Sequence, residues 1–180
     1  MEKRVFIMTF DEDSKSYQAF SHLKEMHTKQ LVVIEQMAVV KNTGNDHLQM
    51  KDFIDVTGAD KTARGSLIGL LIGILGGPMG ILLGWVGGTA IGARRDAKEV
   101  QTAMSVFEQT LHIISEGKTG VILIADALSR NDLRRYAEDK LNGRILQLDY
   151  DLVMTEIEQA QETEKELEHE AKKRWFDKKK

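Results

Sequence analysis

The sequence "GSLIGLLIGILGGPMGILLGWVGGTAIG", residues Gly65 to Gly92, differs sharply from the rest of the chain. It holds ten of the 15 glycines and the only proline, and no charged residue occurs between Arg64 and Arg94. Each glycine costs an isolated helix about 0.8–1.0 kcal/mol relative to alanine. A helical structure here therefore needs compensation from close packing against another surface.

The glycines recur every fourth residue on both sides of Pro78. Residues four apart lie along one ridge of a helix. The helix expected on each side of Pro78, which we call an arm, therefore presents a strip without side chains where another backbone can approach closely. This small-xxx-small spacing is typical of helix pairs in membranes. We predict helix packing and oligomerisation through Gly65, Gly69, Gly73, Gly77, Gly80, Gly84, Gly88 and Gly92.

The length of each arm distinguishes among the possible structures. An arm of about 13–15 residues gives roughly 20–22 Å of helix, which is shorter than the ~30 Å hydrocarbon core of a bilayer. A single kinked helix would cross, but it would place the two flanking parts of the chain on opposite sides of the membrane. We therefore expect a helical hairpin over residues 60–95, with its tip at Gly76, Gly77 and Pro78.

An apolar hairpin must be buried in lipid or in protein. Basic residues surround its two feet, as expected if the hairpin enters an anionic bilayer from the cytoplasmic face. The alternative is a soluble homo-oligomer, a ring or cage, with the hairpins as its shared core. The predicted membrane-surface residues at the feet are Lys61, Arg64, Arg94 and Arg95.

Composition places the remainder of the chain among globular proteins. It has 180 residues, of which 42% are hydrophobic and 29% charged, with a net charge of −3 and no cysteine. This excludes disulfides and thiolate zinc sites and gives no overall attraction to nucleic acid. The opening "MEKRVFIMTFDED" has too short an apolar run for a secretory signal, so we expect the domain on the cytoplasmic side of the cell membrane, or else in the cytoplasm.

Hydrophobic spacing predicts alternating strands and helices on both sides of the glycine segment. Asp13 or Ser14 is expected to cap the first helix and Ser129 a later one. The predicted strands cover residues 5–10, 31–40, 48–56, 120–125 and 146–150, and the longer helices follow residue 14 and cover 100–114.

This order predicts an α+β domain formed by residues 1–59 and 96–150. Apart from the inserted hairpin and the last helix–strand pair, it is the βαββαβ order of a ferredoxin-like sandwich. Helices in such a sandwich cover one face of an antiparallel sheet.

Four stretches in this order resemble a bacterial domain family of unknown function. They are "VFIMTFDEDSKSYQAFSHLKEM", "QMAVVKN", the glycine hairpin and "GKTGVILIAD", together spanning about residues 3–150. Members of that family are described as predicted membrane or stress-associated proteins. The resemblance implies an α+β domain with an inserted glycine-zipper hairpin, and it implies no reaction and no catalytic residues.

Residues 151–180 form a charged tail with a weak apolar seam at Val153, Ile157, Ala160, Leu167 and Ala171, which predicts a helix. The tail is acidic first and basic last, which suits the helix dipole. Two functional interpretations remain open: docking onto a protein partner, or anchoring at an anionic membrane surface. The anchor would consist of Lys172, Lys173, Arg174, Trp175 and Phe176.

Catalytic and metal-binding patterns are weak. "GKTG" at Gly117 lacks the upstream glycine of a phosphate-binding loop, and His22 and His27 are spaced too far around a helix to share a metal. Asp11, Glu12 and Asp13 are better explained as turn residues than as a cation site. We therefore expect no cofactor and no enzyme activity. The alternatives are a self-assembling membrane-associated protein, a soluble oligomer, and a small-ligand sensor that uses the sheet face.

Overall fold

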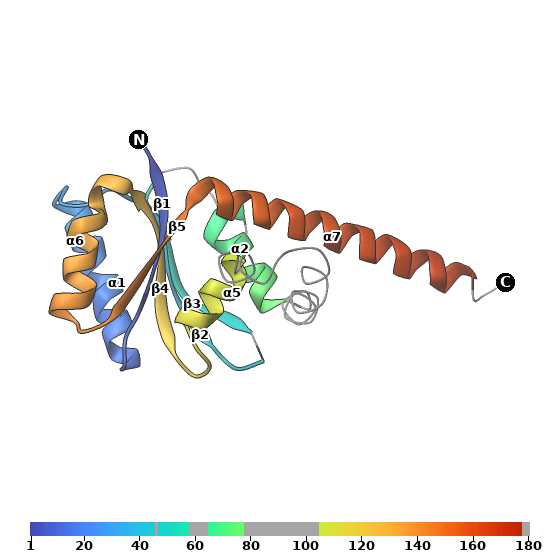
Figure 1. The fold of residues 1–180 in the computed structure, drawn as a ribbon, viewed down its shortest axis with the longest axis horizontal. Helices are drawn as coiled ribbons and strands as arrows, with labels where there is room; N and C mark the ends of the chain where they lie inside the picture. The colour runs from blue at the N-terminus through green and yellow to red at the C-terminus, as the bar shows by residue number, and fades with distance from the viewer. Residues whose placement is uncertain (46, 58–64, 78–104, 178–180) are drawn as a thin grey trace, which may run out of the picture.

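A computed structural model describes residues 1–45, 47–57, 65–77 and 105–177 of the chain. The described part is an α+β fold built on a five-stranded antiparallel sheet with strand order β3-β2-β4-β1-β5 (Figure 1). The strands are β1 (Lys3–Thr9), β2 (Ile34–Asn42), β3 (Leu48–Asp55), β4 (Thr119–Asp126) and β5 (Arg144–Asp149). The α-helices are α1 (Asp13–Thr28), α2 (Leu67–Gly76), α5 (Val106–Ile113), α6 (Arg130–Arg134) and α7 (Tyr150–Asp177).

The central strand β4 lies between β1 and β2 and is antiparallel to both. All eight of its residues are buried. A continuous apolar strand of this kind indicates a sheet with both faces covered. The predicted hairpin of β2 and β3 is confirmed by their antiparallel pairing, with a register shift between Val39 and Val40.

Helices cover both faces of the sheet, so the expectation of a single covered face is wrong. On one face α1 and α6 enclose a core that includes Phe6, Met8, Leu23 and Leu123. On the other face α2, α5 and α7 enclose a second core with Ile7, Val40 and Ile122. The reason is that α2 and the first turns of α7, predicted to lie outside the domain, supply side chains to this second core. Figure 1 shows α2 and α7 on the same side of the sheet as α5.

Several predicted boundaries and caps differ from the structure. Leu31 and Val33 precede β2 and are exposed, because the chain reaches the sheet only at Ile34. The first helix has Glu12 as its N-cap, without a side-chain cap, and Asp13 instead pairs with Lys41 at 2.8 Å. Of the predicted helix over 100–114, the described portion is α5.

Ser129 is the N-cap residue of α6, as predicted, but its side chain makes no capping hydrogen bond. The Asp126 carboxylate accepts a hydrogen bond from Leu128 N and begins a 3₁₀ turn, Ala127–Ser129, ahead of α6. Ser129 Oγ instead accepts a hydrogen bond from Val33 N. A π-helical turn, η3 (Arg135–Lys140), follows α6 and leads to β5.

The C-terminal helix α7 is partly core and partly an extension. Val153, Ile157 and Ala160 are buried against the sheet layer, as the predicted seam requires. With 28 residues, α7 is about 42 Å long. Figure 1 shows its second half projecting past the sheet.

Candidate functional site

The first arm of the glycine segment is helix α2, and its large side chains face the sheet. Ser66 caps the helix, its Oγ accepting a 2.9 Å hydrogen bond from Gly69 N. Six apolar side chains are then at most 7% exposed: Leu67, Ile68, Leu71, Ile72, Ile74 and Leu75. Burial of this many branched side chains offsets the low helix propensity of the glycines.

The glycine strip of α2 faces the other way. Gly65 and Gly73 are exposed, and a Cβ added at either would meet nothing within 4 Å among the residues that the structure describes. Gly69 and Leu70 are half-buried. We call Gly65, Gly69 and Gly73 the outer strip of α2. Its backbone is open to close approach by another helix.

Gly76 and Gly77 were predicted at the tip of the hairpin, and the chain beyond Gly77 lies outside the described residues. Gly76 ends α2 against β3, where an added Cβ would lie 2.6 Å from the Leu48 carbonyl oxygen. At Gly77 an added Cβ would lie 2.8 Å from the Gly73 carbonyl oxygen. Both positions therefore require glycine for packing within the chain.

The other predicted site residues are not brought together by the described structure. Pro78, Gly80, Gly84, Gly88 and Gly92 lie outside the described residues, as do Lys61, Arg64, Arg94 and Arg95. The proposed membrane anchor, Lys172 to Phe176, falls in the last turns of α7. Within the described ranges, no helix combines the length and apolar character needed to cross a bilayer.

A contact that the sequence analysis missed joins α7 to α5. Glu156 of α7 accepts a 2.8 Å hydrogen bond from the backbone N–H of Val106 at the start of α5. Ser105 and Glu108 complete this helix start with a capping box. Burial raises the pKa of the Glu156 carboxyl above its ordinary value of 4.5. The signal in the sequence is an acid one residue from Ile157 on the seam of α7.

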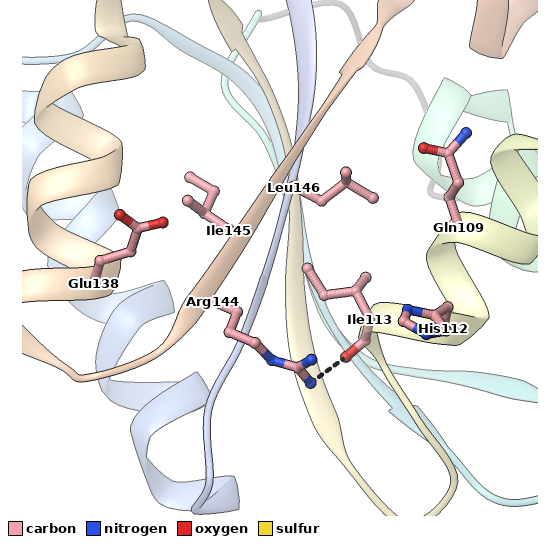
Figure 2. Close-up of a pocket in the computed structure, with 7 residues that line it drawn as sticks. All are labelled: Gln109, His112, Ile113, Glu138, Arg144, Ile145 and Leu146. Carbon is pink, nitrogen blue, oxygen red and sulfur yellow. Dashed lines mark hydrogen bonds between the residues drawn. The ribbon is translucent and has the colours of Figure 1, made fainter. Parts of the chain in front are cut away.

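A hollow lies beside residues 144–146 of β5, an outer strand of the described sheet. It is a groove of about 460 Å³ with Gln109 and His112 of α5 on one side and Glu138 of η3 on the other. Figure 2 shows Ile145 pointing toward the α6 side and Leu146 toward α5, with Arg144 donating a hydrogen bond to the Ile113 carbonyl at 3.5 Å. We call this hollow the β5 groove.

A second hollow of about 310 Å³ continues from the same end of β5. Lys118 and Arg144 both line it, together with Thr9, Phe10, Asp11, Asn142 and Gly143. Lys118 Nζ donates to the backbone carbonyl of Asp11 at 3.1 Å. Within the described part of the chain, neither cation has a carboxylate at ion-pair distance. No sequence motif predicts either hollow, because their lining residues come from separate elements.

The histidines have structural contacts. His22 stacks on Tyr136 with ring centroids 4.4 Å apart, and His27 Nδ1 accepts a 3.1 Å hydrogen bond from Ile34 N. Among residues 1–45, 47–57, 65–77 and 105–177, no three His, Asp or Glu side chains are grouped to hold a metal ion. The segment after Gly117 enters strand β4, as predicted for "GKTG".

Comparison of the chain with protein-family models, with curated proteins and with solved structures gives no match.

Proposed function

We propose that this protein is a non-enzymatic, membrane-associated assembly protein that uses its glycine-rich segment for insertion, oligomerisation or both. An envelope or stress-related role follows from the resemblance described above. The observation that carries the assembly part of this proposal is the orientation of α2, which has its large side chains in the core and its outer strip open. The membrane part rests on the uncharged apolar run of the sequence from residue 65 to residue 93.

This orientation supports separate roles for the two faces of α2. Because the large side chains of α2 pack against the sheet, the first arm attaches the glycine segment to the domain. Its outer strip then contacts another helix, since backbones without side chains gain dispersion and CH···O contacts at short range. The second ladder, Gly80 to Gly92, is the matching surface in the same chain or in a second copy.

The ferredoxin-like description belongs to the same proposal. The strand order β5-β1-β4-β2, with α1 and α6 on one face, has the arrangement of the four-strand sandwich. In this assignment β3, α2 and the rest of the glycine segment are inserted between the second and third strands of the sandwich. The pair α6 and β5, expected to be the addition, completes it instead.

The experiment compares Gly73→Leu with the matched control Gly73→Ala in the full chain. Neither side chain meets a described atom at the Cβ position, so both variants are expected to fold. Leucine fills the strip and should abolish assembly in detergent-free sedimentation, whereas alanine should preserve it. Wild-type chain should float with liposomes containing anionic lipid. A monomeric wild type that does not float contradicts the proposal.

A soluble homo-oligomer is the second candidate. The burial of the α2 side chains in protein favours it, because that arm has no large apolar side chain left for lipid except half-buried Leu70. Flotation separates the two candidates: assembly without flotation supports the soluble oligomer. A ligand sensor on the sheet face receives no support, because helices cover both faces.

A further inference from the structure

The two edges of the sheet are protected to different extents. Outer strands expose unpaired N–H and C=O groups, and natural proteins discourage pairing there with charged residues or bulges. The β3 edge carries exposed Lys51 and Asp52 in mid-strand and a register shift against β2. The β5 edge has Ile145, Leu146, Gln147 and Leu148 between its terminal charges, and among the described strands it pairs only with β1.

The walls of the β5 groove limit what can pair with this edge. Gln109 and His112 of α5 stand on one side of β5, and Glu138 of η3 stands on the other (Figure 2). A single extended strand brings no covering helices into this space, whereas the edge of a second sheet does. Side chains of an added strand would alternate between the α5 wall and the η3 wall.

The charges near Arg144 select a direction for the added strand. β5 runs from Arg144 to Asp149, so a peptide lying antiparallel to it ends beside Arg144. At this end Arg144 and Lys118 line the adjoining hollow, and the bonds described for both go to backbone carbonyl oxygens. These two cations outnumber Asp11, the one acidic residue among the described residues that line this hollow, and neither forms an ion pair in the described chain. The hollow is therefore complementary to the terminal carboxylate of a peptide.

We propose that the β5 groove binds the carboxyl-terminal segment of a protein partner as an added antiparallel strand. Main-chain hydrogen bonds to β5 hold the peptide, and Arg144 and Lys118 receive its terminal carboxylate. Glu138 favours a basic or hydrogen-bond-donating side chain at the position facing η3. This binding is independent of the glycine segment.

The test is selection of a displayed library of random heptapeptides with free carboxyl termini against the full chain. The best peptide is then synthesised as the acid and as the carboxyl-terminal amide. We expect the amide to bind at least about tenfold more weakly in fluorescence anisotropy, as loss of a charge-assisted hydrogen bond requires. Arg144→Gln and Lys118→Gln should weaken binding of the acid, whereas Lys51→Gln on the β3 edge should not.

Backbone amide shifts in NMR locate the peptide. Shifts concentrated in residues 144–149, together with slowed amide exchange there, support strand addition. The proposal is overturned by equal binding of acid and amide, by shifts elsewhere, by a library that yields no binder, or by an edge already occupied by a second copy. Loss of assembly in the Gly73→Leu variant leaves this result unchanged, so the two proposals fail separately.

Discussion

The two faces of α2 have opposite chemistry, although the helix has only ten residues and Gly65 of the outer strip lies just before its N-cap. The inner face carries branched side chains that are nearly inaccessible, and the outer strip exposes bare backbone. Stability should therefore depend on the inner face and assembly on the outer strip. A single short helix can serve both purposes because its period separates them.

The largest expected effect is at the centre of the inner face. Leu71 is 1% exposed in the core beneath α5 and α7. We expect Leu71→Ala to lower the free energy of unfolding by about 2–5 kcal/mol, because truncation removes buried methyl groups and leaves a cavity. Urea unfolding measures it. A loss below 0.5 kcal/mol, roughly the size of a surface change, would show that α2 is not docked.

The next effect concerns the end of the helix. An alanine at Gly76 places its Cβ 2.6 Å from the Leu48 carbonyl oxygen, so α2 or β3 must shift. We expect Gly76→Ala to destabilise the fold by about 1–3 kcal/mol despite its better helix propensity. Unfolding midpoints compared with Gly73→Ala provide the measurement. Identical unfolding midpoints for the two variants would contradict the close contact between Gly76 and β3.

The contact between α7 and α5 gives a smaller, pH-dependent effect. Glu156→Ala should cost about 1 kcal/mol by removing the acceptor for Val106 N. Glu156→Gln keeps an acceptor and has no charge to bury. The two variants therefore separate the hydrogen bond from the charge.

The sign of the pH dependence follows from the raised pKa of Glu156. The folded state holds this proton more tightly than the unfolded state, so the contribution is complete below pH 4.5 and is lost as pH rises through the folded pKa. Relative to Glu156→Gln, the wild type should lose stability as pH rises through this window. Thermal unfolding from pH 4 to pH 8 measures the difference, and a constant difference would contradict the burial of the carboxyl.

The smallest expected effect is on the outer strip. Gly73 is helical and exposed, and its added Cβ meets no described atom. Gly73→Ala should leave the fold unchanged or stabilise it by up to about 1 kcal/mol through helix propensity. Urea unfolding at low protein concentration measures it. A clear destabilisation would mean that the strip is packed within the monomer.

Local patterns predicted much of the fold. The run "GVILIA" became β4, the β-branched stretch and following alternation became the β2–β3 hairpin, and the seam through Val153 and Ile157 became the buried part of α7. Each of these is decided by neighbours in sequence.

The remaining features depend on residues that are distant in sequence. The sequence does not say whether β3 or β4 lies next to β1, because both are strands that could pair with it. In the structure β4 is the neighbour of β1. The apolar residues of α2 were recognised from the sequence. Their burial against the sheet of the same chain was not, because it depends on which face of the sheet the other helices leave uncovered. The β5 groove joins α5, η3 and β5, and no motif marks it.

The position of β4 also constrains the order of folding during synthesis. β1 and β2 are completed early in the chain and leave a vacant place between them that only residues 119–126 fill. All of the glycine segment emerges from the ribosome while that place is empty and two strand edges are unpaired. The least soluble part of the sequence is thus made before the sheet that covers its first arm can close.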